Sequence, residues 1–208
     1  MPGLVEPHDE ELLGRLANAR SVLADLGCGD GKHSLRLAMA EPAALVVGVD
    51  AETTRLDRVA AAARRRRVMN LFFLTWSMDR PLPALAGRCT TITVIMPWGS
   101  LLEGILGTDE QVLTNVLVLG RMGAVLDAVV NCRPWAAPAA LDKKLASTPE
   151  PSLEHLAAMQ RQYIALGWQL NPAVWLTDGE ARALGSSWAS RVVSARASRL
   201  LRLTAVRC

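Results

Sequence analysis

The sequence predicts an α/β fold in which helices cover both faces of a mainly parallel sheet of seven strands. Short apolar runs alternate along the chain with longer stretches of helical composition, and this alternation is typical of parallel strands joined by crossover helices. The run at residues 44–50 is apolar almost without interruption, as expected for a strand buried on both faces. We expect the connections to be right-handed.

The individual elements follow from composition and from local breaks in the pattern. Strands are expected at residues 21–26, 44–50, 70–75, 90–96, 123–131, 167–176 and 198–206. Helices are expected at residues 9–20, 32–40, 52–67, 109–120 and 152–166, with helix or loop at 178–197. Leu12, Leu13 and Leu16 share one face of the first helix, and Pro172 interrupts the sixth strand.

Length and composition indicate a single globular domain over residues 1–208. Half of the residues are apolar and 21% are charged, yet no stretch approaches the ~18 apolar residues of a membrane span. The acidic N-terminus does not resemble a signal peptide, so we expect a cytoplasmic protein that does not contact membranes. A segment rich in proline and alanine predicts an irregular insertion at about residues 131–151.

Two residue types bear on the class of ligand. The four cysteines form no C-x-x-C pair, so neither a zinc site nor a redox motif is expected, and we predict no metal. Only three of the 23 basic residues are lysines. Arginine binds phosphate in a bidentate manner and stacks on bases, although a GC-rich genome would explain the same bias.

The glycine-rich segment from Asp25 to Gly31 follows the first buried strand and precedes a helix. Glycines allow a sharp turn and let a ligand contact bare backbone. The acids Asp25 and Asp30 would repel the pyrophosphate of a dinucleotide, which usually binds at such a helix N-terminus, but they suit a cationic sulfonium. We therefore predict a site for S-adenosyl-L-methionine, whose product is S-adenosyl-L-homocysteine, and regard a nucleotide dehydrogenase as the weaker alternative.

Further acids follow at the ends of the next strands. Asp50 lies about 20 residues beyond the glycine turn, where a carboxylate accepts hydrogen bonds from ribose hydroxyls. Met78 and Asp79 follow the next strand and are expected to meet the adenine ring and its amino group, and Trp76 is expected to border the cofactor. Together these features predict a Rossmann-like class I S-adenosylmethionine-dependent methyltransferase.

The residues expected at the target site restrict which atom is methylated. Attack at a base carbon needs a thiolate, and no cysteine lies in a suitable loop. Exocyclic amines are usually held by an Asn/Asp-Pro-Pro-aromatic loop, whereas Met96-Pro97-Trp98 lacks the acid or amide. A ring nitrogen such as adenine N1 has an in-plane lone pair and needs only positioning, and Trp98 could form one wall of its pocket.

Two other segments allow two interpretations each. Trp188 stands in a serine-rich stretch that is followed by spaced arginines, so it could either stack on a flipped base or pack in the core. The run Arg64–Arg67 could either bind RNA phosphates or form a solvated helix end that stabilises the helix dipole. The sequence leaves both choices open.

Several of these segments resemble a known family, the aminoglycoside-resistance 16S rRNA methyltransferases of the Kam/Npm type, which methylate N1 of adenine 1408. The resemblance covers most of the chain. It is clearest at Asp25–Lys32, at Asn70–Leu74, at Met96–Leu102 and at Ser187–Arg191. Within these, Pro-Trp-Gly-Ser-Leu-Leu is a specific motif. Trp76 and Met78 stand where smaller residues are usual in the family, and the linker after the second strand is shorter.

The resemblance implies roles for individual residues. The expected cofactor-binding residues are Asp25, Gly27, Gly29, Asp50, Ala51, Met78, Asp79, Pro97, Ser100 and Ser186. Trp98 and Trp188 are the expected catalytic pair, which would sandwich the flipped adenine. The expected RNA-binding residues are Arg64, Arg65, Arg66, Arg67, Arg191 and Arg196. The target-binding loop would span about residues 177–197, and the partner of the monomeric enzyme would be the 30S subunit with its 16S rRNA.

Two other functions remain open at the level of sequence. The chain could methylate a small molecule or another RNA, or it could be an RNA-binding homologue with a vestigial or weakly active cofactor site. The arginine run and the paired tryptophans favour the rRNA methyltransferase. A substrate cavity closed by residues 133–151 would favour a small-molecule substrate.

Overall fold

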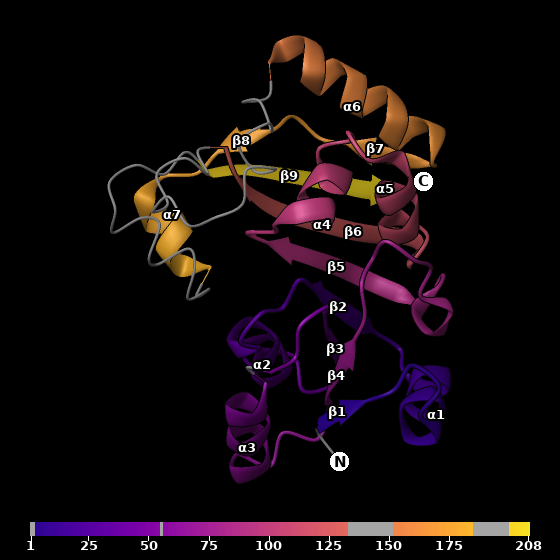
Figure 1. Cartoon of the computed structure of the whole chain (residues 1–208), viewed down its shortest axis with the longest axis vertical. Helices are drawn as coiled ribbons and strands as arrows, with labels where there is room; N and C mark the ends of the chain where they lie inside the picture. Colours follow the sequence, from indigo (N-terminus) through magenta and orange to yellow (C-terminus); the bar gives the residue numbers. More distant parts are fainter. Residues whose placement is uncertain (1–2, 55, 133–151, 185–199) are drawn as a thin grey trace.

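The strands form one twisted sheet, as the computed structural model in Figure 1 shows. The structure describes residues 3–54, 56–132, 152–184 and 200–208. The strand order is β1-β4-β3-β2-β5-β6-β9-β7, and β8 pairs with β9. The strands are β1 (Gly3–Val5), β2 (Val22–Leu26), β3 (Leu45–Asp50), β4 (Leu71–Thr75), β5 (Cys89–Ile95), β6 (Gly120–Asn131), β7 (Trp168–Leu170), β8 (Val174–Trp175) and β9 (Leu200–Arg207).

The helices lie on both faces of this sheet (Figure 1). They are α1 (Glu10–Asn18), α2 (Lys32–Ala40), α3 (Asp57–Arg65), α4 (Gly99–Ile105), α5 (Glu110–Leu117), α6 (Leu153–Ala165) and α7 (Asp178–Ala183), with a short 3-10 turn, η1 (Pro83–Leu85). Apolar residues of α1, α4, α5 and α6 pack on one face, and those of α2 and α3 pack on the other. Within the described ranges, every helix is too short or too polar to span a bilayer.

The expected fold class is confirmed, but the sheet is larger than predicted. Strands β1 to β6 pair in parallel, whereas β9 is antiparallel to β6, β7 and β8. The count of seven strands was wrong because β1 and β8, of three and two residues, are too short to show a period in the sequence. The break at Pro172 was predicted correctly, since it separates β7 from β8.

Two boundaries differ from the prediction, and one helix was not predicted. Helix α3 begins at Asp57 rather than at residue 52, and β6 begins at Gly120 rather than at residue 123. Gly120 was not expected in a strand, but a Cβ there would lie 2.5 Å from the ring of Trp168, so β6 can pass this ring only with a glycine. Helix α4 follows Trp98 directly and was missed because its short apolar run has no clear helical period.

The amide of Asn70 secures the start of the parallel sheet. Its Nδ2 lies 3.0, 3.0 and 2.8 Å from the carbonyl oxygens of Ala38, Glu41 and Ala44. These oxygens come from the end of α2 and the turn that leads into β3. Asn70 therefore joins the α2–β3 connection to the beginning of β4, next to the point where β3 and β4 start to pair in parallel.

Candidate cofactor and target site

A cavity of about 430 Å³ opens at the carboxyl ends of β2, β3, β4 and β5. This is the edge at which parallel α/β sheets bind their ligands. Of the residues predicted to bind the cofactor, eight line it. They are Asp25, Gly27, Gly29, Asp50, Ala51, Met78, Pro97 and Ser100. Trp76 and Trp98 also line the cavity, so the structure brings residues from four strand ends into one site.

The glycine turn forms the floor of the cavity. The backbone N–H groups of Gly27 and Cys28 both donate to the carbonyl of Val49, at 2.8 and 3.1 Å. Gly31 begins α2 with a φ of 69°, and a Cβ there would lie 2.7 Å from Val59 and 2.9 Å from Phe73. Only glycine satisfies both the backbone conformation and the close approach of α3.

Asp25 lies at the base of the cavity and is almost completely buried, with 2% of its surface exposed. Its carboxylate accepts hydrogen bonds from the hydroxyls of Ser34 on α2, at 2.6 Å, and Thr93 on β5, at 3.0 Å. Burial raises the pKa of the Asp25 carboxyl, while the proximity of His33 and the two hydroxyls act in the opposite direction. The hydroxyls therefore orient a buried acid next to the space for a ligand.

Asp50 connects the glycine turn to the end of β3. Its Oδ2 accepts from the backbone N–H of Gly29 at 2.7 Å, and its Oδ1 accepts from the N–H of Glu52 at 2.9 Å. A carboxylate has about four lone-pair sites, so each oxygen can accept a further bond from a ligand hydroxyl. Asp50 thus both holds the turn in place and presents charge to the cavity.

The loop after β4 forms one wall. The side chain of Met78 is buried against the cavity. The guanidinium of Arg80 lies 3.7 Å from the ring centroid of Trp76, and the indole N–H of Trp76 donates to the Arg80 carbonyl at 3.2 Å. This cation–π contact holds the large indole at the cavity wall, so Trp76 and Met78 together restrict the space beside the cofactor site.

Asp79 is exposed and does not line the cavity, although Ser77 and Met78 directly before it do. Its carboxylate accepts hydrogen bonds from Ser100 and Ser77, which lower its pKa, and the bond from Ser77 is 2.5 Å long. Ser77 and Ser100 belong to the loop after β4 and to α4, and both line the cavity. In this structure Asp79 therefore joins two walls of the cavity rather than facing into it.

The segment between β5 and α4 carries the expected target residue. Met96 has a φ of 58°, which is uncommon for a residue other than glycine. Pro97 follows and is buried, and Trp98 is extended and directly precedes α4. Backbone strain of this kind persists where the surroundings enforce it and is frequent at functional sites. Here it turns the chain so that Pro97 and Trp98 both border the cavity.

Several predicted residues cannot be assessed or lie elsewhere. Ser186, Trp188, Arg191 and Arg196, and most of the loop at 177–197, lie outside the described residues, as do residues 133–151. The run Arg64–Arg67 is exposed at the end of α3, away from the cavity lining. Among the described residues, no cluster of three or more His, Cys, Asp or Glu side chains is arranged to hold a metal ion.

Several residues at the site were missed from the sequence, among them Leu101, His33 and Asn115. Leu101 and His33 line the cavity, and the amide of Asn115, on α5, donates to the Met78 carbonyl at 2.9 Å. Asn115 is 3% exposed, and its buried hydrogen bond holds the backbone of the loop after β4 in place. A polar residue within the apolar face of a helix was the available signal for Asn115. The available signal for His33 was its position two residues after Gly31, the end of the glycine turn.

Comparison with known proteins agrees with this geometry. The model of the NpmA family, described as 16S rRNA (adenine(1408)-N(1))-methyltransferase, matches residues 3–207. The chain belongs to this family. A 16S rRNA (adenine(1408)-N(1))-methyltransferase from Streptoalloteichus hindustanus is 37% identical over 180 residues, which cover 84% of this chain and 81% of the relative.

Solved structures of family members share the fold described above. The 16S rRNA methyltransferase KamB superposes with a TM-score of 0.82 at 31% identity, over 96% of this chain and 94% of KamB. A mutant of the 16S rRNA (adenine(1408)-N(1))-methyltransferase from Catenulisporales acidiphilia, solved with the cosubstrate SAM, has a TM-score of 0.79 at 28% identity. That match covers 98% of this chain and 92% of the mutant. The fold is therefore that of a class I methyltransferase.

Proposed function

We propose that the protein transfers a methyl group from S-adenosyl-L-methionine to N1 of adenine 1408 in 16S rRNA and thereby confers aminoglycoside resistance. The observation that carries this proposal is one cavity with acids at the ends of β2 and β3 and a tryptophan at its edge. Family relatives that carry this activity in their names support it. We expect a cytoplasmic enzyme that acts as a monomer on the 30S subunit.

The cavity suits the cofactor chemically. Asp25 and Asp50 present carboxylates to it. His33 also lines it, and the Nε2 atom of this ring is buried without a hydrogen-bond partner among the described residues. Asp25 would face the cationic methionine end, and Asp50 would accept from the ribose hydroxyls. The bound cofactor supplies an activated methyl group on a sulfonium. Gly27, Gly29 and Ala51 would contact it through backbone, whereas Ser186 belongs to the undescribed segment.

The target atom requires positioning rather than proton transfer. The N1 lone pair of adenine can attack the sulfonium methyl directly, so neither a general base nor a metal is needed in this proposal. Trp98 would stack on one face of the flipped adenine. We assign the opposite face to Trp188 and the neighbouring phosphates to Arg191 and Arg196. These three assignments rest on the family resemblance alone.

The end of α3 supports an RNA-binding surface. Arg67 has a φ of 55°, and the N–H groups of Arg67 and Val68 donate to the carbonyls of Arg64 and Ala63. This is the Schellman helix end, in which glycine is the usual residue at the position of Arg67. An arginine there costs backbone energy, which favours a functional reason for its charge over a merely solvated helix end.

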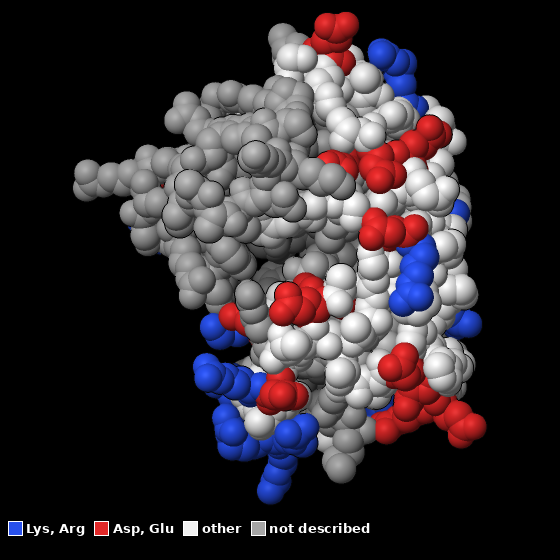
Figure 2. Space-filling model, viewed as in Figure 1, with Lys and Arg blue, Asp and Glu red and all other residues white. Residues whose placement is uncertain are grey.

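The charge distribution is consistent with this assignment. Figure 2 shows Lys and Arg side chains gathered at the end of the molecule where Figure 1 places α3, while Asp and Glu side chains gather toward α1. Arg64 to Arg67 are all exposed. A basic surface of this kind binds phosphate backbones with a strong dependence on salt. We therefore propose that Arg64–Arg67 contact 16S rRNA.

Arg67→Gly should raise stability and weaken RNA binding at the same time. Relief of the left-handed backbone should increase the free energy of unfolding by up to about 1 kcal/mol, or about 2–4 °C in Tm. Loss of one phosphate contact should reduce the salt dependence of 30S binding by about one unit of slope. Thermal unfolding and filter binding at several salt concentrations measure both effects.

Arg67→Ala is the matched control, because it removes the charge but keeps the strained backbone. It should reduce 30S binding as much as Arg67→Gly and should not raise Tm. If both variants bind the 30S subunit with the affinity and salt slope of the wild type, Arg67 has no role in RNA binding.

Expression in an aminoglycoside-sensitive bacterium tests the proposed activity. We expect resistance to kanamycin and apramycin, together with a primer-extension stop at adenine 1408 of 16S rRNA. Purified 30S subunits should accept a labelled methyl group more readily than naked 16S rRNA. Absence of resistance together with unmodified adenine 1408, in cells that contain folded protein, would reject this function.

A further inference from the structure

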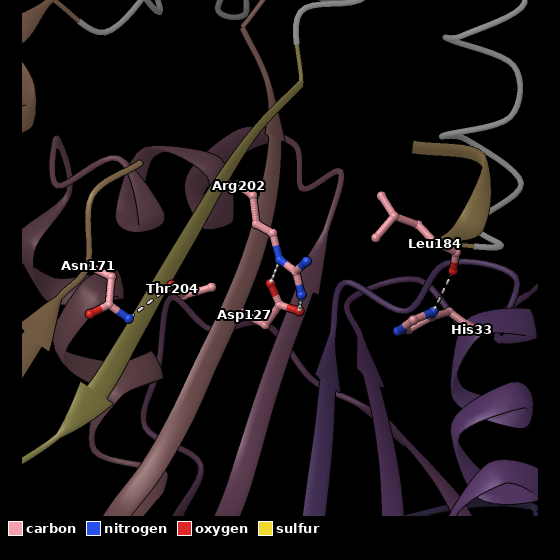
Figure 3. A network of polar contacts seen from close by, with 6 residues as sticks. All are labelled: His33, Asp127, Asn171, Leu184, Arg202 and Thr204. Atoms are coloured by element: carbon pink, nitrogen blue, oxygen red, sulfur yellow. Dashed lines mark hydrogen bonds and ion pairs between the residues drawn. The ribbon is translucent and has the colours of Figure 1, made fainter. Parts of the chain in front are cut away.

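Helix α7 is attached to α2 by two hydrogen bonds to its last carbonyl groups. The Nδ1 atom of His33 lies 3.2 Å from the Leu184 carbonyl, and Arg36 donates to the Ala183 carbonyl at 3.2 Å. Figure 3 shows the imidazole at the beginning of α2 directed at the end of α7. A carbonyl oxygen only accepts hydrogen bonds, so His33 carries a proton on Nδ1.

This attachment matters because α7 is short. It has six residues, and its first turn is closed by a capping box between Thr177 and Glu180. Its other end leads into residues outside the described ranges, and helices of this length depend on tertiary contacts. Ala181 is buried in a small cluster with Ile95 and Met96, two residues that also line the cofactor cavity.

The second nitrogen of His33 is buried in a ring that borders the cavity. The ring lines the cavity, and Nε2 is inaccessible to solvent and lacks a hydrogen-bond partner within the described part of the chain. In Figure 3 it is directed away from Leu184. Burying a polar atom without a partner is unfavourable, so a ligand with polar groups at this position would satisfy it. The same ring thus borders the cavity and holds the end of α7 through Nδ1.

We propose that His33 is a positioning residue that couples occupancy of the cofactor cavity to the placement of α7. A ring bonded at both nitrogens keeps one orientation, so a bound cofactor strengthens the bond to Leu184. By linkage, a firmly held α7 raises cofactor affinity by the same factor. The proposal rests on the proposed function, because it takes the occupant of the cavity to be S-adenosylmethionine or its product.

The chain continues from α7 into residues 185–199, which hold Trp188 and Arg191. Coupling at His33 would therefore relay cofactor occupancy to the anchor from which the proposed RNA-binding segment begins. An enzyme that holds this anchor more firmly when loaded would favour RNA binding after cofactor binding.

Amide hydrogen exchange of residues 178–184, with and without saturating S-adenosylhomocysteine, tests this inference. In the wild type, we expect the product to slow exchange in α7 by at least about fivefold, the lower end of typical allosteric coupling. Exchange in α1, none of whose residues lines the cavity, serves as the internal reference, and calorimetry measures the binding of the product independently.

Two substitutions of His33 test the roles of its two ring nitrogens separately. His33→Asn places an amide nitrogen near the position of Nδ1 and nothing at Nε2, so α7 should stay protected in the free protein while product affinity falls. His33→Gln reaches toward Nε2 but not Nδ1, so affinity should be largely kept while α7 exchanges faster. In both variants, the product should no longer change α7 exchange. Arg36→Ala should loosen α7 in both states and retain the product-dependent ratio.

The possible failures are distinguishable. If the wild type binds the product but α7 exchange changes less than twofold, the coupling is wrong while the proposed function stands. The coupling is equally wrong if either His33 variant, with a Tm near that of the wild type, keeps the wild-type ratio. If the folded wild type gives no binding heat with the product, the proposed function fails and the coupling with it.

Discussion

Trp98→Ala is expected to lower the rate of methyl transfer to 30S subunits by about 100-fold while product affinity changes less than about threefold. Stacking on a base contributes ~1–3 kcal/mol, and misplacing a base relative to the methyl group lowers the rate further. Trp98 lies at the edge of the cavity, between the strained turn at Met96 and the start of α4. Its removal should therefore leave the glycine turn and Asp50 unchanged. Single-turnover methylation measures the rate of methyl transfer, and calorimetry with S-adenosylhomocysteine measures the product affinity.

Two variants control for loss of a large side chain. Trp98→Phe keeps an aromatic face and should retain most of the rate. Trp175→Ala removes an indole on β8 that is 42% exposed and is absent from the cavity lining, so its rate should stay close to that of the wild type. A parallel loss of product affinity and rate in Trp98→Ala would show that the tryptophan supports the cofactor site instead of the target base.

Asp50→Ala should weaken product affinity by at least about 100-fold. Two hydrogen bonds between its carboxylate and ribose hydroxyls, each of ~1.5–3 kcal/mol, account for that loss. The substitution also releases the N–H groups of Gly29 and Glu52, so part of the effect comes from a looser glycine turn. Calorimetry with S-adenosylhomocysteine measures the affinity, and thermal unfolding shows whether the fold is kept.

The controls for this prediction separate charge from position. Asp57→Ala removes an exposed acid from the first turn of α3, outside the cavity lining, and should leave affinity unchanged. Asp50→Asn retains one acceptor and should fall between the wild type and Asp50→Ala. Unaltered affinity in Asp50→Ala, with a normal Tm, would exclude the ribose role that we propose for this carboxylate.

The part of the cavity formed by the glycine turn and Asp50 was predictable because its geometry is local. The bond between Gly29 and Asp50 joins residues 21 apart in the chain, within a single strand–helix–strand unit. In such a unit the two strands are parallel neighbours, so acids at their ends must meet. The glycine turn was likewise predictable, since Gly27, Gly29 and Gly31 all have positive φ, a conformation that other residues rarely adopt.

What the sequence alone determined was the class of fold, the acids and glycines that line the cavity and a tryptophan at its edge, because each depends on a few consecutive residues. The tertiary structure decided how those parts are held. Asn115 supports Met78 across 37 residues, and His33 meets Leu184 across 151. Such contacts depend on which strands are neighbours in the sheet and on which helix ends lie close together in the fold. The hydrophobic period and the turn composition describe single segments of the chain, so they do not predict contacts between segments that are distant in the sequence.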